Sequence, residues 1–304
     1  MPRELVRVDP EVRDALASGR PVVALESTIF SNLGLPRPYN ELALDRCIDA
    51  VRSRGAVPAV TAVLDGVARV GITSAEHERI LGSAHKASAR EIPVAIAQGW
   101  EFGATTVSAS LMLAAHAGIA VFATGGIGGV HRGDAGDVSA DLGAIAQHPV
   151  VTVCAGAKAF LDLPRTLEHL EMLGVPVLGL ATDYFPSFTI ASSGLPIPVR
   201  VDTVDAAAEI VRVHRAMGAT GGILLTVPIP EADALPAPEV EAATEAALAE
   251  ASAAGLTGPA VTPFILERLV AATQGATLVP NVALAAHNAS VAGALAHTLS
   301  TPSG

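Results

Sequence analysis

Apolar runs of strand length alternate with segments of helical spacing through the middle of this 304-residue chain. A strand followed by a helix and then another strand favours a mainly parallel sheet with helices on both faces. The sequence therefore predicts an α/β protein. We expect strands at Pro21–Leu25, Pro93–Ile96, Ile119–Ala123, Val150–Cys154, Val175–Leu180 and Gly221–Val227, and helices at Thr106–Ala117, Ser139–Gln147 and Leu163–Leu173.

Both ends of the chain extend this pattern. An Asp65-Gly66 turn signal between two apolar runs predicts a β-hairpin that joins Ala56–Leu64 to Ala68–Ile72. No internal repeat and no linker rich in Pro, Gly and Ser divides the chain, so residues 1–304 are expected to form one domain. Further helices are expected at Asp9–Ser18, Glu41–Arg54, Ser74–Leu81, Glu239–Ala254 and Pro263–Ala296.

The charge balance is acidic, with a formal net charge of -11 and no run of Lys and Arg. Binding to a phosphate backbone needs clustered positive charge, so a nucleic-acid partner is disfavoured. Half of the residues are hydrophobic but only 3% are aromatic, a composition that suits parallel sheets covered by Ala-rich helices. An anionic small ligand remains compatible with this balance, because its site needs only a few local positive groups.

The chain carries no strong export or membrane signal. Its N-terminus is charged and lacks the apolar core of a signal peptide. Phe102–Val130 contains no Asp, Glu, Lys or Arg and is long enough to span a membrane. Its Gly and Thr residues and the central His116 favour instead a buried helix, strand and Gly-rich turn. Cys47 and Cys154 do not indicate an oxidising compartment, so we expect a cytoplasmic protein with no membrane partner.

Four polar segments follow directly on apolar strands. Ligands of parallel α/β sheets bind beyond the carboxyl ends of the strands, so this coincidence predicts a site. The segments begin at Glu26, Thr124, Lys158 and Pro228–Glu231.

Lys158 stands in an unusually apolar context, after Ala155-Gly156-Ala157 and before Ala159-Phe160. Burial would lower its pKa and leave a neutral amine that can form a Schiff base with a carbonyl carbon. Equally, the side chain could extend to the surface at the end of a strand. The residues alone do not decide between these two interpretations.

The segment Thr124–Asp141 offers two further possibilities. The glycines of Thr124–Gly129 could present backbone N–H groups to a phosphate, or they could form a tight turn. Asp137, Ser139 and Asp141 could share one face and offer oxygen ligands to Mg²⁺ or Mn²⁺. Alternatively, Ser139 could cap the following helix, with Asp141 in its first turn. Upstream, Lys86, Ser88 and Arg90 could hold a phosphate or form a solvated edge.

Together these motifs resemble the pseudouridine-5′-phosphate glycosidase family from about Pro21 to the C-terminal helices. The resemblance rests on eight segments, of which FATGGIGGVHRG and TVCAGAK are long and specific. In order they are ALESTI (Ala24–Ile29), GAVPA (Gly55–Ala59), GATTV (Gly103–Val107), FATGGIGGVHRG (Phe122–Gly133), DVSADL (Asp137–Leu142), TVCAGAK (Thr152–Lys158), PIPE (Pro228–Glu231) and TPF (Thr262–Phe264).

The resemblance implies a three-layer α/β/α fold, a homotrimer and reversible cleavage of pseudouridine 5′-phosphate to uracil and ribose 5-phosphate. Lys158 matches the nucleophile that bonds ribose C1′, and Glu26 matches the acid. Asp137 matches the ligand of a divalent cation, usually Mn²⁺ at one per subunit, with Mg²⁺ or another divalent ion as alternatives. The implied or plausible substrate contacts are Lys86, Thr106, Val107, His131, Ser139, Ala140, Asp141 and Asn288.

Two loops depart from the family pattern. Asn32-Leu33-Gly34 stands where the family often has His-Gly, and the stretch from Gly133 to Asp137 is short. Two other functions compete with the glycosidase. One is a Schiff-base lyase or aldolase that acts on another sugar phosphate through the same lysine. The other is a non-catalytic sugar-phosphate binder in which Lys158 is a charge anchor.

Overall fold

A computed structural model describes residues 4–82, 84–133, 136–256 and 261–301. Its main sheet has the strand order β1-β4-β3-β2-β7-β9-β13-β11-β12, with β6 paired to β3 and β5 to β6. The central and following pairs, from β3-β2 through to β11-β12, are all parallel, which confirms the predicted α/β class. The strands are β1 (Val6–Val8), β2 (Val22–Leu25), β3 (Val57–Leu64), β4 (Val67–Val70), β5 (His85–Ala87), β6 (Phe102–Thr105), β7 (Val121–Ala123), β9 (Val151–Cys154), β11 (Val177–Leu180), β12 (Val199–Val201) and β13 (Ile223–Thr226).

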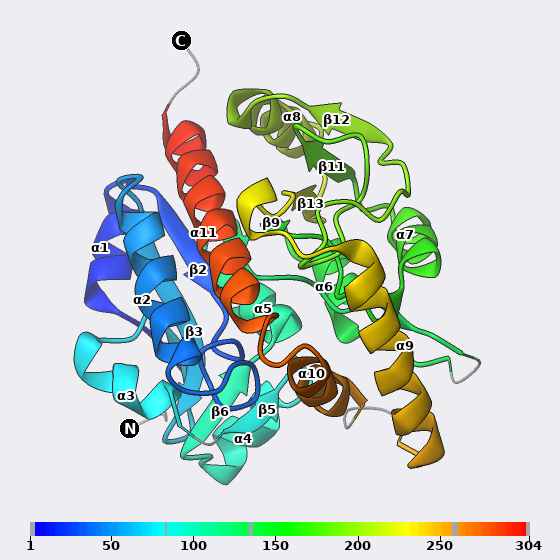
Figure 1. The fold of residues 1–304 in the computed structure, drawn as a ribbon. Coiled ribbons are helices and arrows are strands. Elements are labelled where there is room, and N and C mark those ends of the chain that lie inside the picture. Colours follow the sequence, from blue (N-terminus) through cyan, green and yellow to red (C-terminus); the bar gives the residue numbers. More distant parts are fainter. Residues whose placement is uncertain (1–3, 83, 134–135, 257–260, 302–304) are drawn as a thin grey trace.

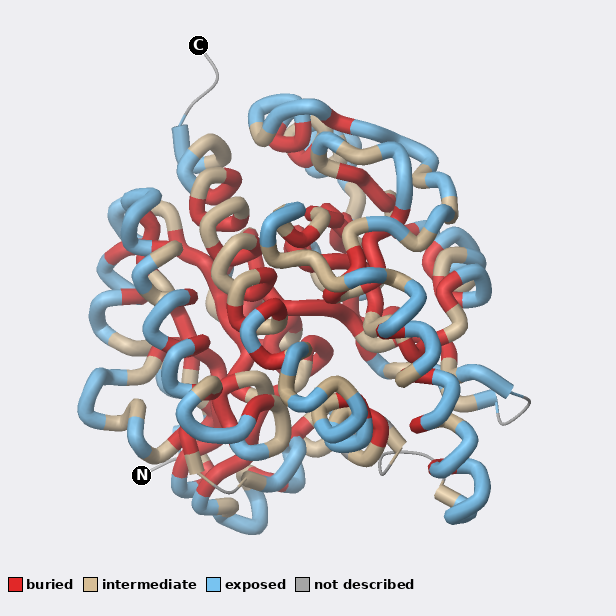
Figure 2. Tube along the Cα trace, viewed as in Figure 1, coloured by how far each residue is buried: buried red, intermediate tan, exposed pale blue. Residues whose placement is uncertain are grey.

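The central strands are apolar because both of their faces are covered. In β2, Val22 and Ala24 belong to one apolar cluster, whereas Val23 and Leu25 belong to the other. This alternation follows from the two-residue period of a strand. Figure 2 shows the buried positions running through the middle of the molecule.

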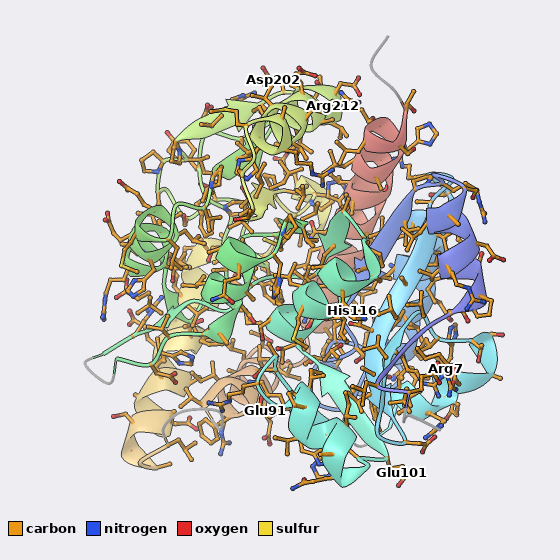
Figure 3. The ribbon with its side chains drawn as sticks, turned by 180° about the vertical axis from the view of Figure 1, so that it is seen from behind. Arg7, Glu91, Glu101, His116, Asp202 and Arg212 are labelled. Atoms are coloured by element: carbon orange, nitrogen blue, oxygen red, sulfur yellow. The ribbon has the colours of Figure 1, made fainter. Side chains whose placement is uncertain are left out.

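Helices cover both faces of the sheet. Figure 1 looks onto the face with α2 (Tyr39–Arg52), α8 (Val204–Ala216) and α11 (Leu278–Ser300). Figure 3, seen from behind, looks onto the face with α5 (Val107–Ala117), where His116 is labelled, and α6 (Ala140–Gln147). The three-layer arrangement is therefore present. The remaining helices are α1 (Pro10–Ala17), α3 (His77–Ile80), α4 (Ile92–Gln98), α7 (Leu163–Met172), α9 (Ala237–Ala253) and α10 (Val261–Ala272), with short 3₁₀ turns η1 (Ser74–Glu76) and η2 (Glu231–Asp233).

The longest strand, β3, changes partner halfway along its length. Val57–Val60 pair with β2 in parallel, whereas Ala62–Leu64 pair with β6 in the antiparallel sense. The other edge of β3 forms the predicted hairpin with β4. The sheet therefore divides near Thr61, and the carboxyl ends of β2 and β6 meet there.

One predicted strand is wrong: Pro93–Ile96 lies within the helix α4. Proline occupies the first turn of this helix, where a missing N–H costs nothing, and Gly99 ends it in the left-handed conformation. The strand of this region is instead β6. It lies at the start of Phe102–Val130, a segment for which the sequence predicted a helix, a strand and a Gly-rich turn. A four-residue apolar run is too short for periodicity to separate the two structures.

The C-terminal prediction needs a second correction. Pro263–Ala296 is not one helix, because α10 ends at Ala272 and α11 begins at Leu278. The sequence analysis also missed β5, β12 and α8. By length and composition α11 could cross a membrane, but 61% of its apolar window is buried within the protein. It packs on β2, β7 and β9, as a core helix of a soluble protein does.

Candidate active site

A cavity of about 670 Å³ lies at the carboxyl ends of β2, β6 and β7. It gathers residues that lie far apart in the sequence, from Glu26 to Asn281. Every predicted site residue except Asn288 lines it: Glu26, Lys86, Thr106, Val107, His131, Asp137, Ser139, Ala140, Asp141 and Lys158. Ser88 and Arg90 line it as well, so the HKASARE segment faces the cavity.

Glu26 is a buried carboxyl group that follows β2 directly. Strand β7 lies next to β2 and ends level with it, since Leu25 pairs with Ala123. Thr124, the residue after β7, therefore lies beside Glu26, and its Oγ1 donates a hydrogen bond to Glu26 Oε1. Burial raises the pKa of Glu26 to about 7, although the charge of Lys158 and the Thr124 hydroxyl act in the opposite direction. An acid with this pKa can hold and release a proton near neutral pH.

Lys158 extends into the cavity from a loop after β9 and is half-buried. Its backbone N–H donates to the Ile127 carbonyl at 3.3 Å, and Ile127 N–H donates to Gly156 O at 3.0 Å. Gly156 has φ +71°, and a Cβ there would lie 1.9 Å from Pro186 O, so only glycine fits. The loop that carries the lysine is thereby attached to the Gly-rich segment.

Three of the six backbone N–H groups of Thr124–Gly129 donate within the protein, so the phosphate-cradle interpretation stays a prediction for Gly125 and Gly126, which line the cavity. The N–H groups of Thr124, Ile127 and Gly128 donate to Val153 O, Gly156 O and Asp141 Oδ2 respectively. Asp141 also accepts from Ser108 N–H at 3.1 Å. Its carboxylate therefore joins the N-terminus of α5 to the Gly-rich segment.

The capping interpretation of Asp137–Asp141 is confirmed, whereas the metal-ligand interpretation stays a prediction. Ser139 caps α6 by accepting a hydrogen bond from Asp141 N–H, as the capping alternative predicts. Asp137 lies before the helix, within 3.8 Å of His131 Nε2. Burial is the main cause that lowers the pKa of His131, and the charges of Lys86 and Lys158 act in the same direction. Asp134 lies outside the described residues.

The positive charges of the cavity are close to the N-terminus of α5. Lys86 is on β5, whose partner β6 leads directly into Thr106 and α5. Partial loss of solvation lowers the pKa of Lys86, and the neighbouring charge of Lys158 adds to this effect. Two lysines and a helix N-terminus that face one space form a suitable site for a phosphate group.

Asp137 and His131 suit a divalent cation whose remaining ligands come from water or substrate. Carboxylate oxygen and imidazole nitrogen both bind Mn²⁺, and hard cations of this size are often held by one or two protein groups together with substrate phosphate. Among the residues that the structure describes, no group of three His, Cys, Asp or Glu side chains could hold an ion. Within that part of the chain the protein therefore supplies at most two ligands of these four residue types to one ion.

A model of the family described as indigoidine synthase A-like protein matches residues 11–298. The chain belongs to this family. Curated relatives named pseudouridine-5′-phosphate glycosidase include those of Methylobacterium nodulans, 51% identical over 98% of this chain and 89% of theirs, and Myxococcus xanthus, 48% identical over 96% and 97%.

Two solved structures of similar proteins agree with this indigoidine synthase A-like fold. The prealnumycin C-glycosynthase AlnA, in complex with ribulose 5-phosphate, superposes with a TM-score of 0.89 at 39% identity and covers 98% of both chains. An indigoidine synthase A-like protein from Thermotoga maritima gives a TM-score of 0.88 at 35% identity and covers 98% of this chain and 97% of its own.

Two of the sequence-predicted positions do not reach the cavity of this family member. Asn288 is fully buried in α11, where its amide donates to the carbonyls of Thr124 (2.9 Å) and Gly125 (3.2 Å). It supports the Gly-rich segment from behind. Glu231, in the Pro228–Glu231 segment, is exposed on η2 and does not line the cavity.

Asn281 and Phe188 are cavity residues that the sequence analysis missed. Asn281 Oδ1 is buried without a hydrogen-bond partner, which is unusual for an amide oxygen. Phe188 has φ +60°, rare for a bulky residue, and its ring packs over Gly126, where a Cβ would lie 2.7 Å away. Only the rare backbone angle marks Phe188, and sequence does not reveal it. Asn281 lies about two turns of α11 before Asn288, so the same residue type in the same helix could have indicated it.

Proposed function

We propose that this enzyme reversibly cleaves the C–C glycosidic bond of pseudouridine 5′-phosphate and yields uracil and ribose 5-phosphate. The observation that carries the proposal is the placement of Glu26 and Lys158 in one cavity, a buried acid with a pKa of about 7 beside an amine. The names of the curated relatives and the ribulose 5-phosphate complex of AlnA support it. The enzyme would belong to the lyase class and would have glycosidase activity.

The chemistry explains why an amine and an acid are both needed. The uracil ring pushes electrons toward C1′ as its N1 loses a proton, the C1′–O4′ bond breaks, and O4′ takes that proton. The neutral Lys158 amine then adds at C1′ and forms a C–N bond, while the electron pair returns to the ring and a proton of the amine passes to N1. Glu26 delivers a proton to uracil C5 while the nitrogen lone pair forms the C1′=N iminium and the C1′–C5 bond breaks. Water hydrolyses the iminium, which releases ribose 5-phosphate and restores the amine.

The two ends of the cavity suit the two ends of this substrate. Lys86 and the α5 N-terminus would bind the 5′-phosphate, a contact remote from the reacting bond that supplies binding energy for orientation. The unpaired Oδ1 of Asn281 would accept an N–H of uracil, and the Phe188 ring would pack on the base. In this arrangement C1′ would lie between Lys158 and Glu26.

Asp137 and His131 would hold the divalent cation, which we propose to be Mn²⁺, with Mg²⁺ or another divalent ion as alternatives. When bound, such an ion neutralises charge on the substrate phosphate. We also propose a cytoplasmic homotrimer, in keeping with the family resemblance in sequence. A Schiff-base lyase or aldolase for another sugar phosphate is the principal alternative, because it would use the same lysine; a non-catalytic binder would not need the buried acid.

The deciding experiment mixes the protein with pseudouridine 5′-phosphate and Mn²⁺ and follows uracil by chromatography. We expect stoichiometric uracil and ribose 5-phosphate, and the reverse synthesis when both products are supplied. Absence of uracil, combined with turnover of another sugar phosphate in the same assay, would establish the lyase alternative instead.

A further inference from the structure

A cluster of buried hydroxyl groups fills the place where β3 changes partner. Its centre is Thr105, the last residue of β6, which is fully buried. Thr105 Oγ1 donates to Thr61 O at 2.7 Å and lies 2.9 Å from Thr61 Oγ1. Thr61 Oγ1 in turn bonds Leu25 O and Ser110 Oγ. The cluster therefore contacts the ends of β2 and β6 and the first turn of α5.

Within this cluster, reciprocal hydrogen bonds join Thr105 to Ser27, the residue after Glu26. Ser27 N–H donates to Thr105 Oγ1 at 3.3 Å, and Thr105 N–H donates to Ser27 Oγ at 2.9 Å. The two hydroxyl oxygens lie 3.1 Å apart. Thr28 adds two hydrogen bonds to Thr105 O, from its N–H and from its hydroxyl.

These bonds replace a strand ladder that is missing at this point. Strands β2 and β6 both pair with β3 but are not paired with each other in the described sheet. No ladder between β2 and β6 therefore sets the distance between Glu26 and Thr106, the residues that directly follow these two strands. The reciprocal side-chain and backbone bonds of Ser27 and Thr105 perform that task.

We propose that Thr105, through Ser27, is a positioning residue that holds the acid Glu26 at a fixed place relative to the phosphate-binding end of the cavity. This inference rests on the proposed function. It gives a physical role to Ser27 of the ALESTI motif and to Thr105 of the GATTV motif, although neither residue lines the cavity. A misplacement of the acid lowers the rate of proton delivery more than it lowers binding.

The test compares Thr105→Val with Thr105→Ser and with Thr226→Val. Valine keeps the shape of threonine and removes the hydroxyl, whereas serine keeps the hydroxyl. Thr226 is a matched control because it is fully buried in β13 of the same sheet and donates to Leu178 O at 2.9 Å, away from the cavity. Thr152→Val is a second control, since its buried hydroxyl has no partner.

Two readouts are needed for each variant. The first is kcat and KM for uracil release; the second is the pKa of Glu26, followed by NMR of ¹³C-carboxyl-labelled glutamates and assigned with Glu26→Gln. We expect Thr105→Val to lower kcat by at least about tenfold with KM changed less than about threefold, as for a geometric displacement of a catalytic group. We also expect it to move the Glu26 pKa by about half a unit or more, while Thr105→Ser and both controls stay near the wild type.

Wild-type kcat and an unchanged Glu26 pKa in folded Thr105→Val would overturn the inference, and so would an equal loss in Thr226→Val. If Thr105→Val does not fold, Ser27→Ala removes the same link from the other side and takes its place. Wild-type protein that releases no uracil would contradict the proposed function. In that case the Glu26 pKa, which needs no turnover, would still decide the positioning role.

Discussion

Thr124 donates its hydroxyl to Glu26 across two neighbouring parallel strands, and this bond is one of the forces that set the acidity of the cavity. A hydrogen bond to a carboxylate stabilises the charged form and lowers the pKa, whereas burial raises it. For Glu26 burial is the larger effect, so its pKa is raised to about 7. The balance between these two forces leads to measurable consequences for stability and for rate.

Glu26 should make the protein less stable as the pH rises. Its pKa is raised from 4.5 to about 7, so its favourable contribution is complete below pH 4.5 and is lost as the pH rises to about 7. The loss should approach roughly 3 kcal/mol, since one pKa unit corresponds to about 1.4 kcal/mol. Glu26→Gln carries no charge at this position at either pH. Its free energy of unfolding in urea should therefore increase relative to that of the wild type between pH 4.5 and pH 8. An identical difference at both pH values would contradict the raised pKa.

Thr124→Val should move the pH profile of activity upward. Removal of the hydroxyl takes away a group that favours the ionised form of Glu26, so the pKa of Glu26 should rise further above its value of about 7. Because the acid must be protonated to act, the alkaline limb of kcat should shift to higher pH. The kcat profile of Thr152→Val, a buried threonine without a hydrogen-bond partner, is the control and should match the wild type. A downward shift in Thr124→Val would show that the hydroxyl acts differently.

Borohydride should attach ribose 5-phosphate covalently to Lys158. Reduction of the iminium would fix one sugar per chain, which intact-mass spectrometry detects and peptide mapping locates. Lys158→Ala should give no adduct. Lys86→Gln should still be modified at Lys158 but should need more sugar phosphate, because it loses a phosphate contact. An adduct mapped to Lys86 in the wild type would refute Lys158 as the nucleophile.

Asp137→Asn should weaken Mn²⁺ binding by about tenfold or more, as expected when a group that holds a metal is altered. Binding can be followed by the loss of the EPR signal of free Mn²⁺, independently of turnover. Asp202→Asn is the control, because Asp202 is an exposed carboxylate paired with Arg200 far from the cavity (Figure 3). Equal Mn²⁺ affinity in wild type and Asp137→Asn would remove Asp137 from the proposed metal site.

Asn281→Leu and Asn288→Leu should fail in different ways. Loss of the Asn281 amide should raise KM for pseudouridine 5′-phosphate by about tenfold, the equivalent of one hydrogen bond, and leave ribose 5-phosphate trapping unchanged. Loss of the Asn288 amide removes the hydrogen bond to the Thr124 carbonyl and one of the two donors to the Gly125 carbonyl, which also accepts from Ala155 N–H, so that variant should show a lower Tm. The assignment would be reversed if Asn288→Leu kept its Tm and raised KM.

The sequence was sufficient to predict the fold class and most of the cavity. Alternating apolar runs predict a parallel sheet because a strand buried on both faces must be apolar throughout, and polar residues at the strand ends mark the edge where a ligand binds. Glu26 and Lys158 were identified in this way, whereas Asp137 was identified from the pattern of oxygen ligands in Asp137–Asp141, in each case together with the family resemblance. Short segments were less certain: α4 was assigned to a strand because four apolar residues do not define a period.

The tertiary structure alone decided how these residues act. Three features depend on packing between segments more than 100 residues apart. They are the half-buried position of Lys158 in the cavity, the burial that raises the pKa of Glu26, and the finding that Asn281 lines the cavity whereas Asn288 supports the Gly-rich segment. The Ser27–Thr105 link joins residues 78 apart in sequence and exists because β3 changes partner at Thr61. Local sequence determines which elements form, whereas burial and hydrogen bonding across the sheet determine the chemistry of the side chains at their ends.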